Sequence, residues 1–185
     1  FTGSEGTLGI VTKALLKLLP APEATKSMIA IFDSIDDAGK AVSGIIAAKI
    51  IPATLEILDN ATIRTVEDFT HVGLPVDADA ILLIEVDGNP VVVEDEKAKV
   101  LEVLKANNAR EVTLAKSAEH KAQLWTARRM ALPCLAKLRP TTFVEDATIP
   151  RSKIPDFLRI VTKASKDHNV TIGTFGHAGD GNMHP

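Results

Sequence analysis

The chain has one cysteine, no tyrosine and only 4% aromatic residues. A single cysteine excludes an internal disulfide and any paired-cysteine metal or redox motif within the chain. That residue, Cys134, lies in the apolar run of residues 131–135, a setting that raises the pKa of a thiol. We therefore expect Cys134 to be structural rather than nucleophilic. The low cysteine content also fits a reducing compartment, and we expect a cytoplasmic protein.

The chain also has no excess of basic residues, with 21 Lys and Arg against 24 Asp and Glu. Without a basic surface to attract phosphates, nucleic acid is excluded as a partner. The longest apolar runs, such as residues 80–84, fall far short of the roughly 20 residues that a membrane helix needs, so we expect no membrane span. The sequence starts at Phe1 without an initiator Met and stops after a Gly- and His-rich stretch. We expect a piece of a longer protein.

Residues 1–20 differ in character from the rest of the chain. Glycines stand at positions 3, 6 and 9, and residues 10–19 form an apolar, strand-like run. Pro20 and Pro22 then end the run, because proline cannot donate to a strand ladder. The sequence predicts a domain boundary there, with a second domain from residue 21 to 185.

Strand and helix signals alternate after this boundary. We expect strands near residues 27–32, 53–58, 79–86, 112–115, 142–148 and 170–176, with helices near 34–49, 60–66, 92–107, 117–137 and 150–168. Helices lie between strands, but the strands are short and unequal. The pattern favours a split α+β fold, with a mainly antiparallel sheet and helices on one face, over a doubly wound parallel sheet.

The stretch from Gly176 to His184 is the most informative part of the chain. It holds two histidines seven residues apart, His177 and His184, with Gly179 and Gly181 on either side of an aspartate. Because glycine disfavours helix, the pattern predicts a tight loop that leaves a strand and brings both imidazoles together, which suits a transition-metal site. The alternative is a Gly-rich turn with two surface histidines and an Asx turn at residue 180 or 182, because two histidines make only half of a tetrahedral shell.

Three weaker patterns accompany this stretch. The Gly-rich residues 3–10 can approach an anion closely, or they form a plain strand-entry turn. Arg128 and Arg129 can bind a substrate carboxylate through a guanidinium fork, or they are solvated surface residues. Glu145 and Asp146 belong to a site, or they form ion pairs with basic residues near 151–153.

Four segments, taken in order, resemble one protein family. Residues 3–14 resemble the close of the flavin-binding domain in the vanillyl-alcohol-oxidase-like superfamily. Residues 176–184 resemble the Gly-His-x-Gly-Asp-Gly-Asn-x-His signature of the FAD-linked oxidase C-terminal domain. Between them, residues 124–129 and 146–151 are similar to segments that the family carries at those places. Within the superfamily, the chain most closely resembles glycolate oxidase flavin subunits and D-lactate dehydrogenases.

The resemblance implies a division of the chain and an activity. Residues 1–20 would be the C-terminal end of an FAD-binding domain, and residues 21–185 a ferredoxin-like, substrate-binding cap domain. The full-length protein would be an FAD-dependent dehydrogenase or oxidase that takes a hydride from a small D-2-hydroxy acid, glycolate or D-lactate, while this piece alone would be inactive. Its partners would be the substrate and other oxidase subunits, including an iron–sulfur subunit. Any association with a membrane would be through these partner subunits.

The resemblance also implies roles for particular residues. His177 and His184 would bind a divalent metal, zinc or manganese, together with a later carboxylate, and Arg128 would face the substrate carboxylate. The residues along the FAD would be Gly3, Ser4, Gly6, Ile10 and Asn182. Relatives that act on D-2-hydroxyglutarate carry a lysine at the position of Val144, so this residue speaks against a dicarboxylate substrate.

Two other functions remain open. One is a superfamily member with a different substrate, such as an alkylglycerone-phosphate synthase or an aromatic alcohol oxidase. The other is an α+β metal-binding or interaction module without flavin chemistry. Flavin absorbance that bleaches with D-lactate or glycolate separates the dehydrogenase from this module.

Overall fold

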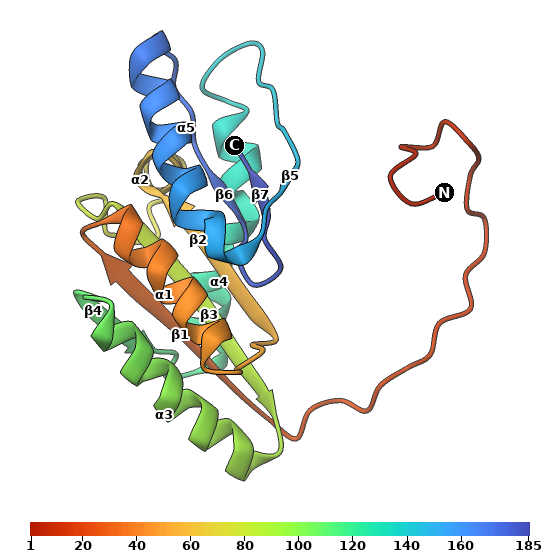
Figure 1. The fold of residues 1–185 in the computed structure, drawn as a ribbon, viewed down its shortest axis with the longest axis vertical. Coiled ribbons are helices and arrows are strands. Elements are labelled where there is room, and N and C mark those ends of the chain that lie inside the picture. Colours follow the sequence, from red (N-terminus) through yellow and green to blue (C-terminus); the bar gives the residue numbers. More distant parts are fainter.

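The computed structural model describes residues 1–185. Its strands form one seven-stranded sheet in the order β4-β1-β3-β2-β6-β7-β5, and every neighbouring pair is antiparallel (Figure 1). The strands are β1 (Ala24–Phe32), β2 (Thr54–Asp59), β3 (Ala80–Gly88), β4 (Glu111–Leu114), β5 (Ala147–Thr148), β6 (Phe175–His177) and β7 (Asn182–His184). The helices are α1 (Ile35–Ala47), α2 (Asn60–Thr70), α3 (Pro90–Ala106), α4 (Ala118–Leu135) and α5 (Ile154–His168), the last preceded by the 3₁₀ turn η1 (Arg151–Lys153).

The first half of the sheet has the ferredoxin-like arrangement. Strands β4, β1, β3 and β2 lie in the order 4-1-3-2, with α1 joining β1 to β2 and α3 joining β3 to β4. Helix α2 is inserted between β2 and β3, and strands β6, β7 and β5 extend the sheet beyond β2. The α+β class and the antiparallel sheet predicted from the sequence are therefore confirmed.

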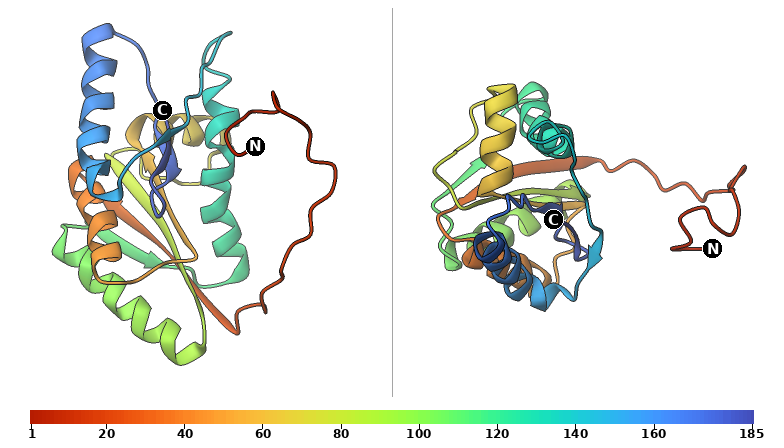
Figure 2. Two further views of the ribbon diagram at one scale, coloured as in Figure 1. Left: turned by 45° about the vertical axis from the view of Figure 1, so that its right-hand side comes forward. Right: turned by 90° about the horizontal axis from the view of Figure 1, so that it is seen from above.

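The expectation that the helices lie on one face of the sheet is wrong. Helices α1, α3 and α5 pack against one face and α2 and α4 against the other, as Figure 2 shows from above. The reason lies in the central strands, which are apolar at successive positions: Met28 and Ala30 point into one hydrophobic cluster, and Ile29 and Ile31 into the other. A strand that is apolar on both faces needs cover on both sides.

The starts of the helices agree with the sequence prediction better than the bounds of the short strands do. Ser34, Asp59, Asn89 and Ser117 each cap a helix by accepting a backbone N–H through the side chain. The strand expected over residues 142–148 is reduced to β5, and the strand expected from residue 170 begins only at Phe175. A strand exists only where a neighbour supplies its hydrogen bonds, and β5 and β7 pair at only two positions.

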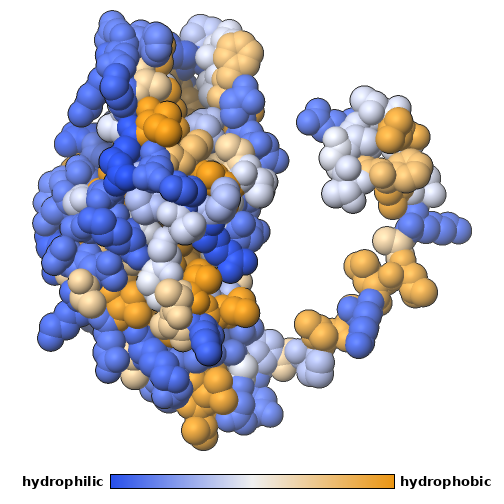
Figure 3. All heavy atoms as spheres, in the orientation of Figure 1, coloured by the Kyte–Doolittle hydropathy of each residue, from blue (hydrophilic) through white to orange (hydrophobic).

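Residues 1–23 precede the folded body and contain no helix or strand. They run away from the sheet in Figures 1 and 2, and Figure 3 shows apolar residues along their length. Ile10 is 87% exposed and Leu15 is fully exposed, because no strand of the chain pairs with this run. The strand-like character expected for residues 10–19 is therefore wrong within this chain. None of the helices combines the length and the apolar character that crossing a membrane requires.

Candidate functional site

The Gly- and His-rich stretch forms a β-hairpin rather than an irregular loop. Strands β6 and β7 pair so that Phe175 opposes His184 and His177 opposes Asn182. The imidazoles of His177 and His184 meet edge to face, with ring centroids 5.6 Å apart and planes at 87°. The predicted convergence of the two histidines is confirmed.

The hairpin contains an Asx turn and two glycines at positions where no other residue would fit. The Asp180 carboxylate accepts the Asn182 N–H at 3.0 Å, as the turn alternative anticipated. Gly181 has a φ of +85°, and a Cβ there would stand 2.0 Å from the carbonyl oxygen of Ile149. A Cβ on Gly176 would stand 2.5 Å from the carbonyl oxygen of Asn182. These two glycines let the backbone approach its own chain.

The register of the sheet places the polar side chains in one row on one face. Glu56 of β2 opposes His177 of β6, which opposes Asn182 of β7, which opposes Thr148 of β5. Directly opposed residues point to the same face of a sheet. This is the face that α2 and α4 cover, because Phe175 lies two positions from His177 and belongs to their hydrophobic cluster.

Glu56, Arg128 and His177 form a closed hydrogen-bonded triangle on this face. Arg128, from α4, donates through Nε to Glu56 Oε2 at 2.5 Å, and His177 Nδ1 lies 2.5 Å from Glu56 Oε1. Arg128 Nη2 stands 3.5 Å from His177 Nε2. The Glu56 side chain is 6% exposed and that of Arg128 is 16% exposed. The charges of this ion pair are therefore largely withdrawn from water.

His184 has a similar but looser environment. Its Nδ1 lies 3.6 Å from Asp146 Oδ1, and its ring lies 5.4 Å from that of Phe175. The Arg128 guanidinium stands 5.0 Å above the same Phe175 ring, within cation–π range. Asp146 thus joins the site through His184, and the alternative of an ion pair with a basic residue at 151–153 does not form.

Asn182 carries an unsatisfied polar atom in the middle of the row. Its side-chain Oδ1 is buried and has no hydrogen-bond partner. A buried acceptor without a donor costs about 1–3 kcal/mol. The position is therefore suited to accept a donor from a bound molecule.

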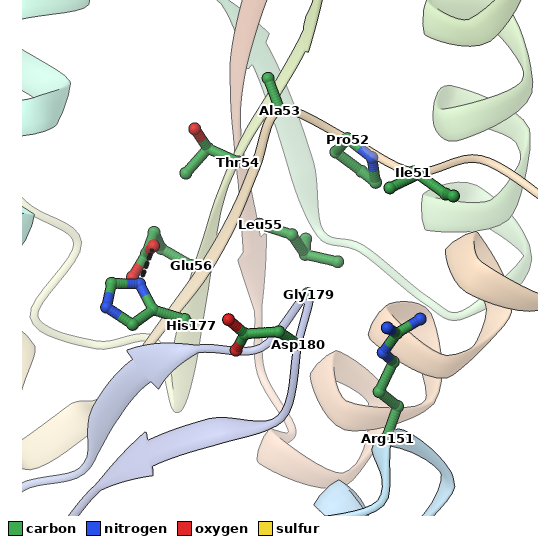
Figure 4. A pocket seen from close by; sticks show the side chains of 10 residues that line it. All are labelled: Ile51, Pro52, Ala53, Thr54, Leu55, Glu56, Arg151, His177, Gly179 and Asp180. Atoms are coloured by element: carbon green, nitrogen blue, oxygen red, sulfur yellow. Dashed lines mark hydrogen bonds and ion pairs between the residues drawn. The ribbon is translucent and has the colours of Figure 1, made fainter. Parts of the chain in front are cut away.

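A cavity of about 270 Å³ opens beside the Glu56–His177 pair. Figure 4 shows this pair at one end, Arg151 at the other and Asp180 between them. The remaining lining comes from residues 51–55 and Gly179. Its size is near the lower end of the range for small-molecule sites, and charged groups of both signs line it.

A buried acid anchors the start of β6 and so the position of the hairpin. Asp59 accepts the Thr62 N–H at 2.9 Å through Oδ1 and the Thr174 N–H at 2.8 Å through Oδ2. Burial raises the pKa of Asp59 to about 6, against the opposing effect of the N–H groups of Thr62 and Thr174. Thr174 directly precedes β6, so this carboxylate ties the end of β2 to the strand that carries His177.

Several other residues singled out from the sequence lie outside this cluster. Arg129 is exposed on α4 and donates to Ala122 and Thr126 of its own helix, which makes it a surface residue. Cys134 is buried in the cluster under α2 and α4, and burial raises the pKa of its thiol, as predicted. Gly3, Ser4, Gly6 and Ile10 lie in the extended N-terminal segment, away from the hairpin.

The chain supplies only part of a metal shell. No group of three or more His, Cys, Asp or Glu side chains is arranged to hold a metal ion. The two imidazoles nevertheless share a feature of metal-binding histidines, because each has a carboxylate beside Nδ1, which leaves Nε2 as the potential ligand. The donor set thus fits two ligands of a site and does not complete one.

Sequence reasoning missed Glu56, the residue that joins Arg128 to His177. A signal was present, because Glu56 is the one acid inside the apolar stretch Leu55 to Leu58. Acids are almost never fully buried without a partner. An acid within a buried strand therefore indicates a partner from elsewhere in the chain.

Comparisons with known proteins agree with this fold. The model of the family described as FAD linked oxidases, C-terminal domain, matches residues 21–185. The glycolate oxidase subunit GlcD of Bacillus subtilis is 50% identical over the whole chain, which covers 39% of that relative. A probable mitochondrial D-lactate dehydrogenase of Danio rerio is 33% identical, again over the whole chain and 37% of the relative.

A solved structure of an alkyldihydroxyacetonephosphate synthase shares the fold, with a TM-score of 0.69 at 20% identity over 98% of this chain and 39% of that one. The chain thus spans about two fifths of the length of the relatives that it matches. Because the family model covers the whole folded body, the chain belongs to the family of FAD-linked oxidase C-terminal domains.

Proposed function

We propose that the full-length protein oxidises a small 2-hydroxy acid, glycolate or D-lactate, with FAD as the hydride acceptor. The observation that carries the proposal is the convergence of Arg128, His177 and His184 on one face of the sheet. The named activities of the GlcD and D-lactate dehydrogenase relatives support the substrate class. A likeness in fold to the synthase structure says nothing about substrate.

Arg128 is suited to hold the substrate carboxylate. Glu56 occupies its Nε, while Nη1 has no hydrogen bond within the chain. Charge-assisted bonds from guanidinium to carboxylate are short and directional, so they fix the orientation of the α-carbon. Oxidation removes a hydride from that carbon and a proton from its hydroxyl, which leaves a 2-oxo acid.

We assign residues 1–20 to the end of the flavin-binding domain, and Gly3, Ser4, Gly6, Ile10 and Asn182 to the flavin. Gly3 and Gly6 have φ values of +78° and +80°, and a Cβ at either would meet nothing within 4 Å. Their backbone is therefore open to close approach by a bound group. The unsatisfied Oδ1 of Asn182 offers an acceptor on the sheet. A bound flavin supplies the hydride acceptor.

His177 and His184 would give two ligands to a divalent metal, zinc or manganese. The remaining ligands would come from other parts of the full-length protein or from the substrate. Their carboxylate partners at Nδ1 support this role. Such an ion, when bound, polarises the substrate hydroxyl. Catalytic roles for both histidines follow from the same proposal.

We further propose a cytoplasmic protein that works with other oxidase subunits, including an iron–sulfur subunit. The Bacillus subtilis relative bears the name of an oxidase subunit, which supports an assembly. Co-purification of the tagged full-length protein tests it, and a single polypeptide of full activity would contradict it.

Anaerobic flavin reduction tests the activity directly. The purified full-length protein is mixed with glycolate, D-lactate or L-lactate in the absence of oxygen, and the visible flavin absorbance is followed. Bleaching by glycolate or D-lactate and slower bleaching by L-lactate is expected. A protein that holds flavin but bleaches with none of the three would refute the proposed function.

A further inference from the structure

Glu56 is an acid where the fold otherwise places apolar side chains. It points to the same face of β2 as Leu58, which belongs to the cluster under α2 and α4. The whole residue is only 4% exposed. An unpaired carboxylate in such a place costs several kcal/mol, so its surroundings must compensate its charge. Two site residues, Arg128 and His177, are the partners that do so.

The hydrogen-bonding capacities within the triangle fix the tautomer of a neutral His177. A carboxylate only accepts and a guanidinium only donates. The proton must then lie on Nδ1, which faces Glu56 Oε1, while Nε2 faces Arg128 Nη2 with its lone pair. The other tautomer would set a lone pair against the carboxylate and an N–H against the guanidinium.

We propose that Glu56 is a positioning residue that holds His177 in the Nδ1–H tautomer and fixes one edge of the Arg128 guanidinium. The lone pair of His177 Nε2 and the Nη atoms of Arg128 then face the site together. What these atoms do in turnover rests on the proposed function, whereas the tautomer and the orientation do not. Glu56 itself acts only through its two neighbours.

A second ion pair joins α4 to the sheet and serves as a comparison for a purely structural role of Glu56. Lys121, seven residues before Arg128 on α4, forms an ion pair with Glu85 of β3 at 2.6 Å. The Glu85 side chain is 14% exposed, so this pair also joins α4 to the sheet in a partly buried place. It contacts no histidine. Glu85→Gln is therefore a matched control for the loss of one ion pair beneath α4.

Histidine NMR reads the tautomer without reference to activity. The chain has five histidines, so His177 is assigned in ¹⁵N-histidine-labelled protein by the signal that His177→Gln removes. Wild type and Glu85→Gln are expected to show the Nδ1–H pattern. In Glu56→Gln the one side-chain oxygen goes to the Arg128 Nε–H and the amide N–H₂ faces His177, so the ring shifts toward the Nε2–H form. Glu56→Asp, which keeps the carboxylate, should retain the wild-type tautomer, and it remains available if Glu56→Gln does not fold.

Kinetics of the full-length protein complete the test. Glu56→Gln is expected to lower kcat about 10- to 100-fold, the usual effect of removing a carboxylate that is hydrogen-bonded to a functional histidine. Glu56→Asp should restore part of kcat, and Glu85→Gln should change it little. An unchanged tautomer in Glu56→Gln overturns the proposal, and so does a changed tautomer with wild-type kcat. If the tautomer changes but wild-type flavin is not reduced by any 2-hydroxy acid, the positioning role stands and the proposed function fails.

Discussion

Asp59 gives the protein a pH dependence of stability that can be worked out from its surroundings. Burial raises the pKa of this carboxyl from an ordinary 3.8 to about 6. The folded protein then binds the proton more tightly than the unfolded chain does. The contribution of Asp59 to stability is therefore complete below about pH 4 and is lost as the pH rises through 6. This rise of about two units in the pKa of Asp59 corresponds to about 3 kcal/mol of unfolding free energy lost by pH 7.

Asp59→Asn isolates this effect. Asparagine is neutral, like the protonated acid, and keeps one oxygen to cap α2. Its N–H₂ cannot accept the Thr174 N–H, which costs the variant about the same free energy at every pH. Between pH 4 and pH 7, the difference in unfolding free energy between the two proteins should shift toward the variant by up to about 3 kcal/mol. All other ionisable groups are the same in both proteins, so their contributions cancel in the difference.

Urea unfolding of both proteins between pH 4 and 7 measures the shift. The quantity to compare is the difference in unfolding free energy at each pH, with equal m-values as a check that the unfolded states match. A difference that stays constant, or that moves toward the wild type as pH rises, would refute the reasoning. It would mean that the N–H donors at the start of α2 outweigh burial and hold the pKa of Asp59 at or below its ordinary value.

Three further predictions concern the site. Arg128→Lys in the full-length protein should lower kcat/KM by a factor that corresponds to roughly 2–4 kcal/mol, because an ammonium group cannot keep the bond to Glu56 and also present a planar donor to the substrate carboxylate. Arg129→Lys should leave kcat/KM unchanged in the same steady-state assay. His177→Ala or His184→Ala should remove metal, measured by elemental analysis, and turnover together while flavin remains bound; normal turnover in either variant would disprove the metal role. Gly181→Ala should lower the unfolding free energy by more than about 1 kcal/mol in urea titrations, since its φ is +85° and a Cβ would stand 2.0 Å from Ile149 O, and an unchanged midpoint would contradict this packing.

The elements that could be predicted from the sequence are those with local causes. Helix α1 begins after Ser34 and α4 after Ser117 because a short polar side chain there can cap the first turn. The buried strand β3 follows from an apolar run bounded by turn residues. The convergence of His177 and His184 also follows locally, since a tight Gly-rich turn between them must return the chain on itself.

What could not be predicted depends on which strands become neighbours. Residues 170–174 have strand-forming residue types but pair with no other strand, while the shorter segment 182–184 pairs with both β5 and β6. The apolar run of residues 10–19 similarly remains without a partner in this chain. Strand propensity becomes a strand only where another backbone lies alongside.

The same dependence explains why the site is larger than its sequence motif. Glu56 and His177 are separated by 121 positions, and only the addition of β6 to the free edge of β2 makes them cross-strand neighbours. Once that pairing exists, the two-residue period of a strand brings Glu56, His177 and Asn182 to one face, and α4 lays Arg128 across them. The buried acid in β2 is thus satisfied only when the hairpin and α4 are both in place, so assembling the site and compensating a buried charge are the same folding event.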